Sequence, residues 1–273
     1  MDETQRKRLF QVGNGVFAIA TIVVNILANA LPLNNKYTGE LSDNLPNLFV
    51  PSGITFAIWG IIYVLWIVFV LYSSHDLFSK KQINMPYLDK IHGLFILTCL
   101  ANMTWIFLWH YEYVVLSLLP MVVLFLSLLL IYQRLEIGKT PATIKDTLCI
   151  FLPFSVYLGW ITVALIANIT GALVSLGYSS LDLPVQQLWT LLILIVGTLI
   201  GFLVLWRRKD IGYTLVIVWA YFGILLKRLG DDPVFGVQTT IAGTAGILCA
   251  VLLLSIIIIF ILEWKKGFPL LKK

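Results

Sequence analysis

The sequence predicts an all-α protein, a polytopic bundle of about eight transmembrane helices. The 273 residues are 59% hydrophobic and only 12% charged, with a mean hydropathy of +0.92. A soluble domain carries about 25% charged residues, so this chain would expose too much apolar surface in water. Long apolar runs recur from end to end, and the basic residues gather in alternate connecting segments. No connecting segment is long enough to hold a soluble domain.

Eight apolar segments have the roughly 20 residues needed to cross the hydrocarbon core of a bilayer. They are 10–33, 52–73, 91–110, 113–133, 148–173, 187–206, 211–228 and 238–263. The first follows the charged start "MDETQRKRLF" and shows no clear small-residue cleavage site, so we interpret it as a retained span. The short connections "HYEY" and "RRKDIG" predict tight hairpins between spans three and four and between spans six and seven.

The distribution of Lys and Arg predicts the orientation of these spans. With eight spans, 16 of the 19 basic residues lie on the side that holds both termini, and Lys36, Lys227 and Arg228 lie on the other. We therefore expect both termini in the cytoplasm and the protein in a plasma membrane. Asp231 and Asp232 follow Lys227 and Arg228, which favours either a locally neutralised turn or an anion site at the outer mouth.

Several kinds of chemistry find no support in the sequence. Cys99, Cys149 and Cys249 lie inside apolar runs without CxxC or Cys/His spacing, so neither a metal site nor a disulfide framework is predicted. No ionisable residue lies at the centre of a span, which argues against a proton-coupled carrier and an intramembrane hydrolase. The net charge of +5 is explained by the cytoplasmic loops, so no nucleic-acid partner is expected. We predict no catalysis and no resident cofactor.

Polar and aromatic residues inside the spans mark the candidate site. Two helical faces carry them: Thr98, Asn102 and Trp105 on the third span, and Tyr157, Trp160 and Asn168 on the fifth. Asn25 and Asn29 share a face of the first span. Each set could form hydrogen bonds between helices or line a ligand cavity. Large aromatic faces with a few polar tips favour a flat or rigid hydrophobic ligand.

Three segments together resemble one known family. In "FVPSGITFAIWGIIYVLW" (49–66), "LTCLANMTWIFLWH" (97–110) and "LPFSVYLGWITVALIANIT" (152–170), order and spacing are similar to helices two, three and five of the TspO/MBR family, the tryptophan-rich sensory and translocator proteins. The matching positions are Pro51, Phe56, Trp59, Tyr63, Asn102, Trp105, Tyr157, Leu158, Trp160, Ala164 and Asn168.

The resemblance implies a five-helix core, residues 1–176, to which this chain adds a three-helix segment, residues 177–273. It also implies a pocket near the first outer loop for a porphyrin, haem, another tetrapyrrole or a sterol-like lipid. The ligand-binding residues it implies are Trp59, Tyr63, Asn102, Trp105, Tyr157, Trp160 and Asn168. Porphyrin breakdown in this family is attributed to outer-loop tryptophans, and the loop 34–50 has none. We therefore do not expect that activity.

The functional prediction is an integral membrane protein that binds a hydrophobic small molecule as a sensor, carrier or regulator. The alternative is a secondary transporter of a small solute. The expected partners are membrane lipid and the hydrophobic ligand. The small residues Gly243 and Gly246 of the last span favour close helix packing, either within the chain or in a homodimer.

Overall fold

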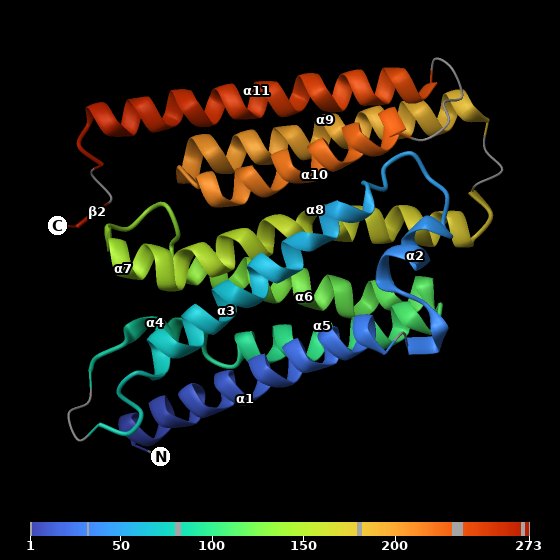
Figure 1. Ribbon diagram of the computed structural model, residues 1–273. Helices are drawn as coiled ribbons and strands as arrows, with labels where there is room; N and C mark the ends of the chain where they lie inside the picture. Colours follow the sequence, from blue (N-terminus) through green and yellow to red (C-terminus); the bar gives the residue numbers. More distant parts are fainter. Residues whose placement is uncertain are drawn as a thin grey trace.

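Eight long helices form the protein in the computed structural model, which describes residues 2–31, 33–79, 83–178, 182–230, 237–268 and 271–272 (Figure 1). Within these residues, seven helices are long and apolar enough to cross a membrane, and an eighth apolar helix, Leu94–His110, has 17 residues. The chain is therefore a multi-pass membrane protein. In Figure 1 both ends of the chain lie at the same end of the bundle, as an even number of spans requires.

The long helices follow the predicted spans closely. They are α1 (Glu3–Ala30), α3 (Ile58–Ser74) with the 3₁₀ turn η2 (Gly53–Ala57) before it, α5 (Leu94–His110), α6 (Val114–Arg134), α8 (Leu152–Ser175), α9 (Leu183–Arg208), α10 (Ile211–Gly230) and α11 (Val237–Lys265). The hairpins α5–α6 and α9–α10 are as tight as the sequence predicts. The smaller elements are η1 (Leu33–Asn35), α2 (Thr38–Asp43), α4 (Pro86–Ile91), α7 (Ile144–Asp146), η3 (Thr147–Phe151), β1 (Ala142–Thr143) and β2 (Leu271–Lys272).

The helices form two packed groups. Helices α1, α3, α5, α6 and α8 make one bundle, and α9, α10 and α11 lie together along the α8 side of it (Figure 1). Helix α8 is the central element, since it contacts α3, α6 and α10 and two thirds of its most apolar window is buried. The division of the chain near residue 176 into a core and an added segment stays a prediction.

The starts of α1 and α5 differ from the starts of the predicted spans. Helix α1 begins at Glu3 rather than near residue 10, because Asp2 and Gln5 form a capping box at its start. Helix α5 begins at Leu94 rather than residue 91, because His92 takes a positive φ of 48° and separates it from α4. A hydrophobicity window detects neither type of signal.

A π-helical turn lies just before Pro153, near the start of α8. Proline has no N–H to donate to the preceding turn. Just before it, η3 runs from Thr147 to Phe151, and the Leu152 N–H bonds to the Thr147 carbonyl five residues back. Helices α7, η3 and α8 thus continue as one rod from residue 144 to residue 175 with a local irregularity near its start.

Close backbone contacts hold α10 against the five-helix bundle. A Cβ on Gly223 would lie only 1.9 Å from Thr55 Oγ1, and the Gly223 carbonyl accepts a hydrogen bond from Ser52 N–H at 3.0 Å. The Trp219 indole N–H donates to the Thr55 carbonyl at 2.9 Å. The hydroxyl oxygens of Thr162 in α8 and Tyr213 in α10 form a hydrogen bond of 2.9 Å. Helix α10 is therefore packed directly against the five-helix bundle.

Candidate functional site

A column of stacked aromatic rings links α3 and α5. Tyr63 stacks on Trp59 at 5.7 Å between ring centroids, Trp59 on Trp105 at 6.5 Å, and Trp105 on Trp109 at 5.7 Å. The interplanar angles between neighbouring rings are 22° to 26°, so each ring is stacked on the next. Helical spacing explains the column, because Trp59 and Tyr63 are one turn apart, as are Trp105 and Trp109.

Helix α8 closes the column from the side with rings set edge-on. Tyr157 and Trp160 meet the Trp59 ring at 5.9 and 6.3 Å, at angles of 65° and 83°. Phe56 in turn meets Trp160 at 5.9 Å. Such edge-to-face contacts contribute about 0.5–1.5 kcal/mol each beyond the burial of their area. The predicted aromatic positions of three separate spans thus come together in one cluster.

A cavity of about 50 Å³ lies beside this cluster, at the end of the bundle away from the termini. Its lining residues are Thr38, Ser42, Pro51, Phe56, Trp59, Trp105, Trp109, Trp160, Val163, Ala164, Ala167 and Asn168. Ligand pockets usually hold about 300–1,000 Å³, so only a very small molecule fits the cavity in this conformation. A larger ligand requires the lining to move apart.

The predicted ligand-binding residues fall into two layers around this cavity. Trp59, Trp105, Trp160 and Asn168 line it directly. Tyr63, Asn102 and Tyr157 do not line it and instead support the first layer from deeper in the bundle. Among the described residues, the buried indole N–H of Trp160 has no hydrogen-bond partner. Trp160 itself is a residue of the cavity wall.

Both asparagines of the predicted site are engaged by protein groups. Asn102 donates to the Tyr157 hydroxyl at 3.1 Å and accepts from Asn25 at 2.7 Å. Asn168 accepts from the Trp105 indole N–H at 3.1 Å. The Asn168 amide also donates to the Ser117 hydroxyl at 3.0 Å. The interhelical interpretation of these polar residues therefore holds for Asn25, Asn102 and Asn168.

The short helix α2 covers the cavity and lies within the outer loop 34–50, where no helix was predicted. Thr38 and Ser42 of α2 line the cavity, and the Thr38 carbonyl accepts from the Trp109 indole N–H at 3.3 Å. The Thr38 hydroxyl lies 2.9 Å from Nε2 of His110, whose side chain is fully buried. A local signal for α2 exists in Glu40, whose carboxylate accepts from the Tyr37 N–H at the start of the helix.

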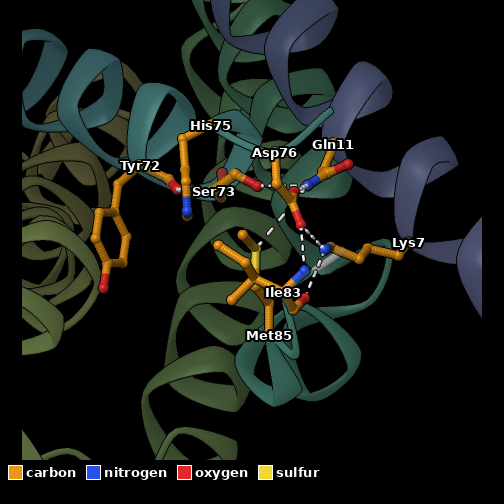
Figure 2. Close-up of polar contacts among 8 residues, drawn as sticks. All are labelled: Lys7, Gln11, Tyr72, Ser73, His75, Asp76, Ile83 and Met85. Carbon is orange, nitrogen blue, oxygen red and sulfur yellow. Dashed lines mark hydrogen bonds and ion pairs between the residues drawn. The ribbon is translucent and has the colours of Figure 1, made fainter. Parts of the chain in front are cut away.

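A second polar cluster ties the N-terminal turns of α1 to the turn after α3 (Figure 2). The Asp76 carboxylate, 1% exposed, pairs with Lys7 and accepts from Gln11 and from the Ile83 N–H, each at 2.7 Å. Burial alone raises the pKa of Asp76, but the hydrogen bonds from Lys7, Ile83 and Gln11 outweigh it and lower the pKa to about 2. This cluster was not predicted, and its contacts fix the relative position of α1 and α3.

Lys227, one of the basic residues on the outer side, pairs with Asp43 at the end of α2. The predicted partners Asp231 and Asp232 lie outside the described residues. Arg228 is buried and donates to the Gln238 side chain at 3.1 Å. The contact with Asp43 links the added helix α10 to the segment that covers the cavity.

No group of three or more His, Cys, Asp or Glu side chains in the described part of the chain is placed to hold a metal ion. The chemistry that the candidate site offers is aromatic stacking, apolar burial and a small number of hydrogen-bond donors. Such a site binds and orients a molecule with extended apolar faces.

Comparison with known proteins identifies the family. Neither the curated proteins nor the solved structures gave a match. The family model described as TSPO-like protein matches residues 11–258, which include all eight long helices in whole or in large part. The match covers the aromatic cluster and also the three helices that follow it. The chain therefore belongs to the TSPO-like protein family.

Proposed function

We propose that this membrane protein binds a flat hydrophobic molecule, a tetrapyrrole such as a porphyrin or haem or a sterol-like lipid, beside the aromatic column. The single observation that carries the proposal is the convergence of Trp59, Trp105, Trp109 and Trp160 around one cavity. Parallel indole faces suit stacking on a planar ligand, and the Trp160 N–H adds a donor. Binding without chemical conversion suits a role as a sensor, carrier or regulator.

Ligand entry in this proposal requires α2 to move. The cavity of about 50 Å³ is several times smaller than a site for a drug-sized ligand. Helix α2 forms part of the wall and is joined to α5 through Trp109 and His110. These few polar contacts are weaker than the packing of a whole span, so α2 is the part of the wall that opens at the lowest cost.

The positive-inside distribution supports the topology that we propose, with both termini in the cytoplasm and the candidate site near the opposite face of a plasma membrane. Cysteine-accessibility labelling of intact cells tests the orientation. A cysteine introduced at Lys139 should be protected from an impermeant reagent, and one introduced at Lys36 should react.

Tryptophan-quenching titrations with protoporphyrin test the binding proposal on the full chain in nanodiscs. Trp105→Ala and Trp160→Ala should each weaken binding by about tenfold, since one stacking partner contributes on the order of 1 kcal/mol. The matched control is Trp264→Phe, because Trp264 lies in the part of α11 near the termini and is 64% exposed. Unaltered affinity in both cavity variants would contradict the assignment.

A second candidate function, transport of a small solute, is favoured by one observation in α1. Gln11, Asn14, Thr21 and Asn25 are all buried on one face of this helix. The side-chain amide of Asn14 has no hydrogen-bond partner among the described residues. Light scattering by proteoliposomes measures how fast glycerol or urea enters them, and so tests for a solute pathway through the protein. If the wild type makes liposomes more permeable than empty ones, and Asn14→Leu abolishes this increase, the result would favour transport over binding alone.

A further inference from the structure

A second, larger cavity lies far from the aromatic column, at the end of the bundle that holds the termini. Its volume is about 370 Å³, within the range of ligand sites. The five-helix bundle contributes Thr147, Phe151 and Leu152, α10 contributes Leu215, and α11 contributes Phe260. The cavity thus lies between the core and the added helices.

Most of the cavity wall is apolar and partly open to the surroundings of the protein. Leu215 is 45% exposed and Phe260 is 43% exposed. Phe268, after the end of α11, also lines the cavity and contacts the Phe260 ring at 5.7 Å. Trp206 and Trp264 lie at the same end of α9 and α11 and are largely exposed, as tryptophans at a membrane–water interface are. The cavity is therefore at the depth where lipid headgroups meet acyl chains.

Basic residues dominate the segments that form the polar edge of the cavity. Segments 134–147, 205–215 and 259–268 contain eight Lys and Arg residues and four Asp and Glu residues. Arg208 lines the cavity and is only partly buried, and one of its N–H groups bonds to the Ile137 carbonyl at 3.2 Å. A guanidinium has five N–H donors, so Arg208 keeps capacity for an anion.

The two carboxylates that line the cavity are already engaged by the protein. Asp210 accepts from the Ser155 hydroxyl at 2.6 Å and from the Tyr213 N–H at 3.0 Å. Burial raises the pKa of Asp210, and these hydrogen bonds offset part of the effect. Glu263 pairs with Lys266 at 3.6 Å. With both carboxylates counted, the three segments still carry four more basic than acidic residues.

We propose that this cavity binds an anionic phospholipid from the surrounding bilayer, with one acyl chain against Phe151, Leu215 and Phe260 and its phosphate near Arg208. The acyl chain passes from one apolar medium to another, so retention depends on its packing against these side chains and on attraction between the phosphate and the basic residues. The bound lipid would fill the gap between the core and α11 and so hold the added helices in place. This proposal is independent of the ligand proposed for the aromatic column.

Native mass spectrometry of the full chain tests this proposal after reconstitution in equal amounts of phosphatidylglycerol and phosphatidylcholine. The wild type should retain one phosphatidylglycerol in preference to phosphatidylcholine. Leu215→Trp fills the cavity and should lose the retained lipid. Arg208→Gln should reduce the preference for phosphatidylglycerol about fivefold, which corresponds to one basic residue.

Leu203→Trp is the matched control, because Leu203 is 51% exposed on α9 and does not line the cavity. It should retain the lipid as the wild type does. Equal retention of both lipids by the wild type, or unchanged retention by Leu215→Trp, would overturn the proposal. A change only in oligomeric state on Leu215→Trp would assign the cavity to a contact with a second copy and would equally overturn it. If the tryptophan variant does not fold, Arg208→Gln decides the question alone.

Discussion

Trp105 of α5 donates its indole N–H to the side-chain oxygen of Asn168 of α8 at 3.1 Å, and both residues line the candidate cavity. The bond restrains the plane of a ring that stacks on both Trp59 and Trp109. A polar contact between two helices thereby sets the geometry of an aromatic surface. Ser117 of α6 holds Asn168 from the far side.

Replacing Asn168 by leucine should therefore weaken both packing and binding. The variant leaves the buried Trp105 N–H without its acceptor and removes the hydrogen bond that the Ser117 hydroxyl accepts. Interhelical hydrogen bonds in membranes contribute about 0.6–1.7 kcal/mol. We expect lower thermal stability and weaker protoporphyrin binding. Thr104→Ala is the control, because exposed Thr104 bonds only to the Leu100 carbonyl of its own helix. Equal loss in both variants would show that the effect is not specific to the contact between Trp105 and Asn168.

Removing the charge of Asp76 should destabilise the protein strongly. Asp76→Asn leaves Lys7 largely buried without its carboxylate, which costs about 3 kcal/mol for a buried pair. Asp89→Asn breaks only the exposed pair with Arg6 and should cost less than about 1 kcal/mol. Thermal unfolding at neutral pH compares the two variants. Similar midpoints for both would contradict the role of the cluster in Figure 2.

The same carboxylate should produce an acid-dependent loss of stability. The pKa of Asp76 in the folded protein is about 2, below its ordinary value of 3.8. A lowered pKa gives stability that is present above the unfolded value and is lost as the pH falls, here between about pH 4 and pH 2. Unfolding measured across this window should show a slope in the wild type that Asp76→Asn lacks. An identical slope in both proteins would assign the acid sensitivity to other groups.

Gly223 should not tolerate even a methyl group. In Gly223→Ala the new Cβ would lie 1.9 Å from Thr55 Oγ1, so α10 must shift away from η2 at a cost of about 1–3 kcal/mol. Gly243→Ala is the control, because nothing lies within 4 Å of its added Cβ and alanine favours the helix. Thermal unfolding of both variants measures the difference. Equal stability would mean that α10 does not pack on the core as described.

Loosening α2 should speed ligand entry. His110→Ala removes the contact with the Thr38 hydroxyl, which helps to hold α2 over the cavity. Stopped-flow quenching should then show faster protoporphyrin association than in the wild type. His75→Ala provides the control, because His75 lies beyond α3 near the termini and is exposed. An association rate that His110→Ala leaves unchanged would argue that α2 does not limit entry.

The sequence was sufficient to predict the spans, because the length and hydropathy of an apolar segment are local properties. Helical spacing places Trp105 on one face with Asn102, and Trp160 on one face with Tyr157. The structure brings both tryptophans against Trp59. Spacing alone does not identify partners. It could not show that Asn102 and Asn168 satisfy Tyr157 and Trp105.

Features that depend on contacts between distant segments were missed. Helix α2 covers the cavity through Thr38, which lies about 70 residues from Trp109 and His110 in the chain. Asp76 meets Lys7 across a similar separation. The small volume of the cavity results from how the side chains interdigitate, which cannot be predicted from composition or periodicity. The sequence places Asp210 in the loop between two predicted spans, yet the packing of α8 against α10 buries it.

The central claim, that a ligand binds in the cavity beside the aromatic column, is tested most directly by filling that cavity. Ala167 of α8 lines it, and Ala167→Phe would occupy its small volume without removing any aromatic or polar group. Ala250→Phe on the exposed face of α11 is the matched control. Protoporphyrin affinity should fall by about tenfold or more in Ala167→Phe and stay at the wild-type value in Ala250→Phe. Equal affinity in all three proteins would contradict the account.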